Sequence, residues 1–119
     1  MKVRSIRKEK VFTPEFNGNK DLPEDEQVKI EVKQFPTAIE VSQYKDFAFS
    51  TDGSVKLKYN DAMIVTRHAG KIENLEDDDG KIATGEQLAK SKNLVFGDLI
   101  AEFRDYILDA GEGLAQGES

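Results

Sequence analysis

The chain is 119 residues long, enough for one modest hydrophobic core and too short for two independent ones. Hydrophobic residues make up 38% and charged residues 34% of it, without a long apolar run, so we expect neither a membrane span nor an apolar signal peptide. The absence of cysteine excludes disulfides, thiolate nucleophiles and cysteine metal sites, and it fits a reducing cytoplasm. We therefore expect a single domain over residues 1–119.

The net charge of −6 is unevenly distributed, because the first ten residues carry five basic groups and one acid. This basic segment is predicted to be a solvated N-terminal arm or an edge strand. A nucleic-acid tether is the alternative. It is disfavoured because the segment contains no aromatic residue and the acidic remainder would repel phosphate.

The first elements in chain order are a ragged strand within residues 1–13 and a loop over 13–25. Two prolines and an Asn-Gly turn favour the loop, since proline removes a backbone donor and Asn-Gly favours tight turns. We expect Phe16 and Leu22 to pin this loop to the body.

The clearest strand covers residues 27–35, where Val28, Ile30 and Val32 alternate with charged residues. Thr37 and Glu40 then match a capping box, which predicts a short helix over residues 38–46. We expect this helix to bury some of four large side chains, which are Ile39, Val41, Tyr44 and Phe47.

Residues 47–50 and 54–59 flank an Asp-Gly turn and predict a β-hairpin, with Val55, Leu57 and Tyr59 on one face. Asn60 offers a cap for a helix that runs to about residue 69 and packs on the sheet, with Gly70 as the stop signal.

The acidic segment 75–86 comes close to a calcium-binding EF-hand loop. With Gly80 at the sixth position, Asp77, Asp79 and Glu86 occupy ligand positions, but Leu75 stands where the first oxygen ligand is needed. These three acids are the candidates for cation binding. The alternative is a hairpin or exposed loop whose acids stay solvated.

The strongest predicted helix is the last one, long and amphipathic, with one apolar stripe and with Gly111 and Gly113 as its expected end. The stripe can form the core of the domain or contact a partner. The candidates for partner binding are Phe96, Leu99, Ile100, Phe103 and Ile107. Residues 112–119 are expected to be a flexible tail. A second capping-box match at Thr84 predicts a short helix before this one.

Together these elements predict an α+β fold: a small antiparallel sheet of three to four strands with three to four helices. An enzyme is not expected, because His68 is the only histidine and no activating partner or phosphate-binding glycine motif accompanies it. For the same reason we expect no cofactor.

Three pieces of the sequence carry a resemblance to a known family. They are residues 12–19 with 22–27, residues 72–75 through 79–82 with 84–88, and the closing helix. Their order resembles small proteins encoded among the tail genes of long-tailed bacteriophages and prophages, similar to tail assembly chaperones. The resemblance implies a factor in the host bacterial cytoplasm that keeps the tape-measure protein soluble and helps to recruit tail-tube subunits.

Two alternatives stay open at this point. Small phage proteins at the head–tail joint or tail terminus more often contain a β-sheet and form homo-oligomeric rings, and in that case the protein is part of the virion. A small regulator that binds DNA through residues 1–10 is the third reading. In none of these readings is a membrane a partner.

Overall fold

The computed structural model describes the backbone of residues 9–115 and the side chains of residues 9–110. Within residues 9–115 the chain forms an α+β fold with four α-helices, three 3₁₀ helices and seven short strands. This is the predicted class. The basic N-terminal segment, apart from its last two residues, lies outside the described part, and DNA binding through it stays a prediction.

A three-stranded antiparallel sheet forms one layer of the body, in the order β1-β2-β5. Its strands are β1 (Val11–Phe12), β2 (Lys29–Val32) and β5 (Ala69–Glu73). The alternation predicted around β2 is confirmed, because Val28, Ile30 and Val32 are buried. Only the end of the predicted first strand falls in the described part, and there it spans two residues.

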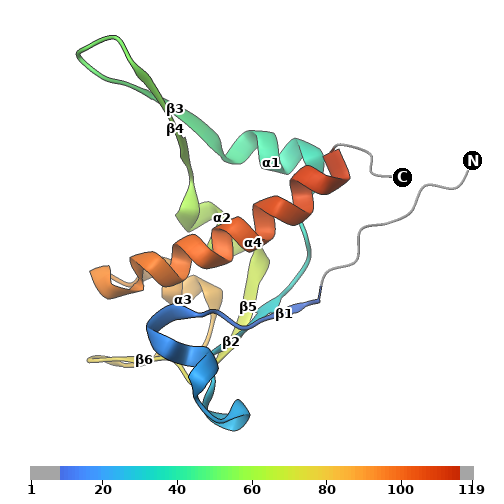
Figure 1. The fold of residues 1–119 in the computed structure, drawn as a ribbon, viewed down its shortest axis with the longest axis vertical. Coiled ribbons are helices and arrows are strands. Elements are labelled where there is room, and N and C mark those ends of the chain that lie inside the picture. The colour runs from blue at the N-terminus through green and yellow to red at the C-terminus, as the bar shows by residue number, and fades with distance from the viewer. Residues whose placement is uncertain (1–8, 116–119) are drawn as a thin grey trace, which may run out of the picture.

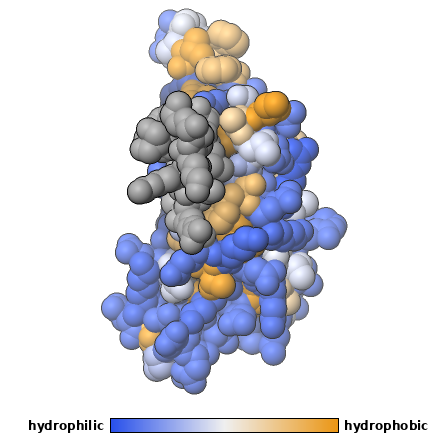
Figure 2. All heavy atoms as spheres, turned by 90° about the vertical axis from the view of Figure 1, so that its right-hand side faces the viewer, coloured by the Kyte–Doolittle hydropathy of each residue, from blue (hydrophilic) through white to orange (hydrophobic). Residues whose placement is uncertain are grey.

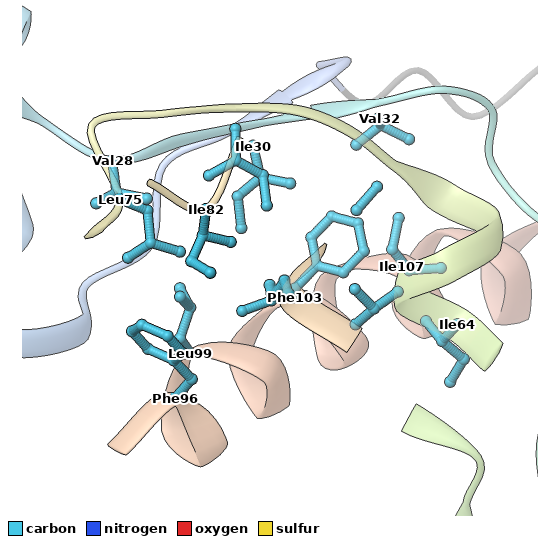
Figure 3. Packing of buried hydrophobic residues seen from close by; sticks show 14 of the residues in the cluster. Val28, Ile30, Val32, Ile64, Leu75, Ile82, Phe96, Leu99, Phe103 and Ile107 are labelled. Atoms are coloured by element: carbon cyan, nitrogen blue, oxygen red, sulfur yellow. The ribbon is translucent and has the colours of Figure 1, made fainter. Parts of the chain in front are cut away.

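Helix α4 (Gly97–Ala115) runs across the body (Figure 1), α2 (Asp61–His68) packs against it, and α3 (Gly85–Lys90) packs against α2. Side chains of the sheet and of the segment around the acidic turn face those of α4 (Figure 3). The helix continues past Gly111 and Gly113, contrary to the prediction. Each glycine costs only about 1 kcal/mol in a helix interior, too little to end one anchored in the core.

The predicted loop over 13–25 contains two 3₁₀ helices, η1 (Phe16–Asp21) and η2 (Glu24–Glu26). Phe16 packs edge-on against Phe96, with ring centroids 6.5 Å apart. Leu22 does not pin the loop, because it is exposed. Buried Asn19 does so instead: its amide donates to the carbonyls of Pro14 and Val28, and its oxygen accepts from the Val28 amide.

Helix α1 (Ala38–Tyr44) begins with the predicted capping box between Thr37 and Glu40. It ends two residues earlier than predicted, since strand β3 (Lys45–Phe49) begins directly after it. Val41 and Tyr44 are buried. Ile39 and Phe47, which were also candidates for burial, are exposed.

The predicted helix after Asn60 is α2, capped by the Asn60 side chain, which accepts from the Met63 amide. Gly70 is not its stop signal but the second residue of β5. The acidic segment forms the hairpin alternative, with β6 (Glu76–Asp77) paired to β7 (Gly80–Lys81). Among residues 9–115, no helix combines the length and the apolar character needed to cross a membrane.

Helix α3 starts at the cap Thr84, whose hydroxyl accepts from the Gln87 amide as predicted. In a capping box the Gln87 side chain would accept from the Thr84 amide, but here it accepts from the amide of the preceding residue, Ala83. Gly85 begins the helix where a methyl group would collide with the Ala69 carbonyl. The close approach of α3 to α2 and β5 therefore depends on this glycine.

Candidate protein-binding surface

The hairpin of β3 and β4 (Val55–Tyr59), called here the hairpin arm (residues 45–59), is exposed over most of its length. It projects from one end of the molecule (Figure 1). At its base the Asn60 amide donates to the Tyr44 carbonyl at 2.9 Å. The Arg104 guanidinium lies 5.9 Å from the Tyr59 ring centroid and forms a 3.2 Å ion pair with Asp61. The base is thus fixed to the body.

The strand register gives the hairpin arm two different faces. Phe47 lies opposite Leu57 and Phe49 opposite Val55, and directly opposed residues of an antiparallel pair share a face. These four apolar side chains are all exposed, with Phe47 at 59% and Phe49 at 80% of their full accessibility. Figure 2 shows hydrophobic residues at this projecting end.

The other face of the hairpin arm is charged. It carries Asp46 opposite Lys58 and Lys56 opposite Ala48. An isolated two-stranded hairpin is marginal in water, and stable sheets cover an apolar face with a second layer. The hairpin arm has the pattern of a half-buried sheet, yet nothing in the described part of the chain covers its apolar face.

The tip of the hairpin arm is a defined turn. The Ser50 amide donates to the Ser54 carbonyl at 2.9 Å, and Gly53 adopts a positive φ of 85°. Asp52 accepts from the Ser50 hydroxyl and from the Ser54 amide. These hydrogen bonds, the Ser50 bond first, lower the pKa of the Asp52 carboxyl to about 2, so the tip carries a negative charge at neutral pH.

A second, smaller apolar site lies before α4, on the 3₁₀ helix η3 (Leu94–Phe96). Leu94 is 94% exposed and Val95 is exposed as well, while Phe96 turns into the core. The Asn93 side chain caps this turn by accepting from the Val95 amide.

The predicted partner-binding stripe of α4 is not on this surface. Phe96, Leu99, Phe103 and Ile107 are buried, and Ile100 is half-buried. The stripe forms the core, which is the other possibility that the sequence allowed. A partner has no access to these side chains while the domain is folded this way.

The acidic candidates Asp77, Asp79 and Glu86 are not gathered around one point. Asp77 accepts from the Asp79 amide within the hairpin turn, whereas Glu86 pairs with Lys90 on α3 at 2.8 Å. Leu75 is buried, so the start of the would-be loop belongs to the core. Among the described residues, no three His, Cys, Asp or Glu side chains group as metal ligands.

His68 is fully buried and links three segments. Its Nδ1 lies 2.9 Å from the Gln34 carbonyl, which only accepts, so Nδ1 carries the proton. Its Nε2 then accepts from the Tyr44 hydroxyl at 2.7 Å. Burial lowers the pKa of the imidazole, which favours its neutral form.

Comparisons with known proteins add no assignment. No protein-family model matches the chain, and searches of curated proteins and of solved structures found no match.

The exposed face of the hairpin arm was missed at the level of the sequence. The signal was present as Phe47 and Phe49 on one strand and Val55 and Leu57 on the other. Alternation of this kind predicts that one face is apolar, but it does not distinguish an exposed face from one that packs against the core.

Proposed function

We propose that this protein acts by protein–protein binding in the morphogenesis of a phage or prophage tail, in the manner of a tail assembly chaperone in the bacterial cytoplasm. The observation that carries the binding class is the apolar face of the hairpin arm, exposed on a body with a well-packed core. The tail setting and the tape-measure client rest on the resemblance of three sequence segments.

The state of His68 supports a role without catalysis. General acid–base or nucleophilic chemistry requires a side chain that reaches a substrate. Both ring nitrogens of the only histidine are engaged inside the protein, and its side chain has no exposed surface. The described surface also exposes large apolar side chains, among them Phe47, Phe49 and Leu94, and apolar contact is how a chaperone holds a helical client.

The test is a binding assay between the purified protein and overlapping segments of the tape-measure protein encoded in the same genome, with tail-tube subunits as the second set of ligands. Binding of one or more segments is the expected result. We expect the variants Phe49→Glu and Leu94→Glu, separately or together, to reduce it, because both place a charge on exposed apolar sites. Lys56→Glu, on the charged face of the hairpin arm, is the matched control.

Failure of every tape-measure segment and tail-tube subunit to bind would contradict the chaperone role. The second candidate is then a structural component at the head–tail joint or tail terminus. The observation in its favour is the β structure within residues 11–73, which contribute the three-stranded sheet and the hairpin arm. A solution mass corresponding to a discrete ring of many copies would support that candidate.

A further inference from the structure

We propose that the hairpin arm is a self-association site: two copies of this chain pack the apolar faces of their arms against each other around a two-fold axis, with the arms antiparallel. The inference goes beyond the proposed function, because it concerns a contact between copies and not the client. Both contacts use the same face of the arm, so a second copy and a client exclude each other there.

The first argument is the pattern of the arm itself. Phe47, Phe49, Val55 and Leu57 line one face without a charge among them, and Asp46, Lys56 and Lys58 line the other. Two such ribbons stacked face to face about 10 Å apart form a small sandwich that is apolar inside and charged outside. A two-fold contact needs a surface complementary to itself, which an uninterrupted apolar face provides.

The second argument is the placement of charge at the two ends of the apolar face. Lys45 lies at the base, on the same face as Phe47, and ionised Asp52 lies at the tip. In antiparallel arms the base of one copy meets the tip of the other, so each Lys45 approaches the partner's Asp52. In parallel arms Lys45 would face Lys45 and Asp52 would face Asp52, which like charges disfavour.

The length of the arm fits this arrangement. A strand of five residues spans about 17 Å at about 3.3 Å per residue, and the turn follows directly. With the two-fold axis between the Phe47–Leu57 and Phe49–Val55 pairs, base and tip lie at comparable distances on either side of it.

The third argument is area, which sets the expected strength. A phenylalanine side chain offers about 150–250 Å², so the two exposed rings leave about 200–350 Å² accessible on each arm. Val55 and Leu57 add to this surface. The sum over two arms lies below the about 1,200 Å² of a standard stable interface, in the range of transient contacts. We therefore expect a reversible dimer with a dissociation constant on the order of micromolar.

A contact of this kind closes after two copies. Each arm is used once, and no further apolar arm remains to extend the assembly into a ring or filament. The expected product is thus a dimer, which agrees with a chaperone and not with a ring built through the arms.

The experiment is sedimentation velocity or light scattering over a concentration series that spans the micromolar range. We expect a monomer–dimer equilibrium, and Phe49→Glu should weaken it by at least about tenfold. Leu94→Glu introduces the same charge at another exposed apolar site, away from the arm, and should leave the dimer unchanged. Circular dichroism checks that each variant retains the fold of the body.

A charge swap tests the antiparallel arrangement. Lys45→Asp and Asp52→Lys should each weaken self-association, because each creates like charges at both ends of the contact. An equimolar mixture of the two variants should regain the dimer, since the new aspartate then faces the new lysine. Lys56→Glu is the control on the outer face and should have no effect.

Four results would overturn the inference: a monomer at every concentration, a larger closed or open assembly, a dimer that survives Phe49→Glu, or one that Leu94→Glu abolishes. Failure of the charge-swapped mixture to associate would overturn the antiparallel pairing. Binding of tape-measure segments by a strictly monomeric protein would leave the proposed function standing and remove the dimer. A dimer that binds no tail protein would support the self-association inference and contradict the chaperone role.

Discussion

The sheet of the body and the hairpin arm are built from the same kind of sequence, and they end in opposite environments. Val28, Ile30 and Val32 alternate with polar residues and are buried, whereas Phe47 and Phe49 alternate in the same way and are exposed. The difference lies in what covers each face. Helix α4 lies over the body sheet (Figure 3), whereas the arm projects from the body and contacts it near its base, through α1 and through Arg104 of α4. Alternation therefore predicts an apolar face but not whether another element packs against it.

The largest effect should come from removing the cover of the body sheet. Phe103 is fully buried on α4, and Phe103→Ala should destabilise the protein by about 3–5 kcal/mol because it leaves a cavity between helix and sheet. Urea denaturation followed by circular dichroism measures the loss. A change below about 1 kcal/mol would mean that α4 does not hold the core as described.

Gly85→Ala should destabilise by about 1–3 kcal/mol. The added Cβ would lie 2.6 Å from the Ala69 Cβ and 2.8 Å from the Val65 carbonyl oxygen, closer than packed atoms approach. Because the obstacle is backbone, α3 has to move as a unit. Gly97→Ala is the matched control: its φ of −54° is helical and nothing lies near its Cβ. Thermal denaturation should show that variant to be neutral or stabilised.

Tyr44→Phe should cost about 1–3 kcal/mol, since it removes the hydroxyl that donates to His68 Nε2 and leaves a buried acceptor without its partner. The same hydroxyl also accepts a long hydrogen bond from Arg67 at 3.5 Å. Chemical denaturation of the variant measures the loss. Tyr59→Phe, at the half-buried base of the arm, provides the comparison and should cost less.

The stability of the body should fall as the pH drops below the ordinary imidazole range near 6.5. Burial lowers the pKa of His68, against the opposing effects of the Gln34 carbonyl and the Glu40 carboxylate. Between the lowered pKa of the folded state and the ordinary value, the unfolded chain binds more protons than the folded chain. The free energy of unfolding therefore rises with pH in this window, and the contribution of His68 to stability is complete above it.

Denaturant midpoints measured between pH 5 and 8, about the range in which histidine titrates, test this expectation. Arg67 and Lys33 also lie near the ring and disfavour its protonation. His68→Gln should remove the slope in this window, because the chain has no other histidine. A wild-type slope of the opposite sign would contradict a neutral buried imidazole.

The smallest effect is expected on the arm. Phe49→Ala should change the stability of the monomer by no more than about 0.5 kcal/mol, because an exposed side chain loses little burial. The stability should be measured at protein concentrations at which the protein is monomeric. Hydrogen exchange of the same sample should show faster exchange for amides of the arm than for those of β2 and β5. A loss comparable to that of Phe103→Ala would place Phe49 in the core.

Much of the local structure could be predicted because short-range chemistry decides it. Thr37 and Glu40 satisfy free amides at the start of α1, and the Asp52-Gly53 turn sets the register of the arm. The last helix was predicted because its apolar stripe repeats with the helical period. These features depend on residues only a few positions apart.

The elements that the sequence misplaced depend on distant neighbours. Gly70 was interpreted as a helix stop, but it lies in β5, where pairing with β2 fixes it. Leu22 was expected to anchor its loop, but buried Asn19 replaces it by bonding to Pro14 and Val28. Neither outcome has a signal within a few residues, because each is set by a contact between separate segments.

The sequence by itself determined the class of fold, the position of the hairpin arm, the helix caps at Thr37, Asn60 and Thr84, and the apolar stripe of the last helix. Only the tertiary structure decided which apolar faces are covered: the stripe of α4 packs against the sheet, and the apolar face of the hairpin arm stays exposed. The physical reason is that burial is a property of two surfaces. The periodicity of the sequence predicts one apolar surface, and only the fold determines whether a second surface packs against it.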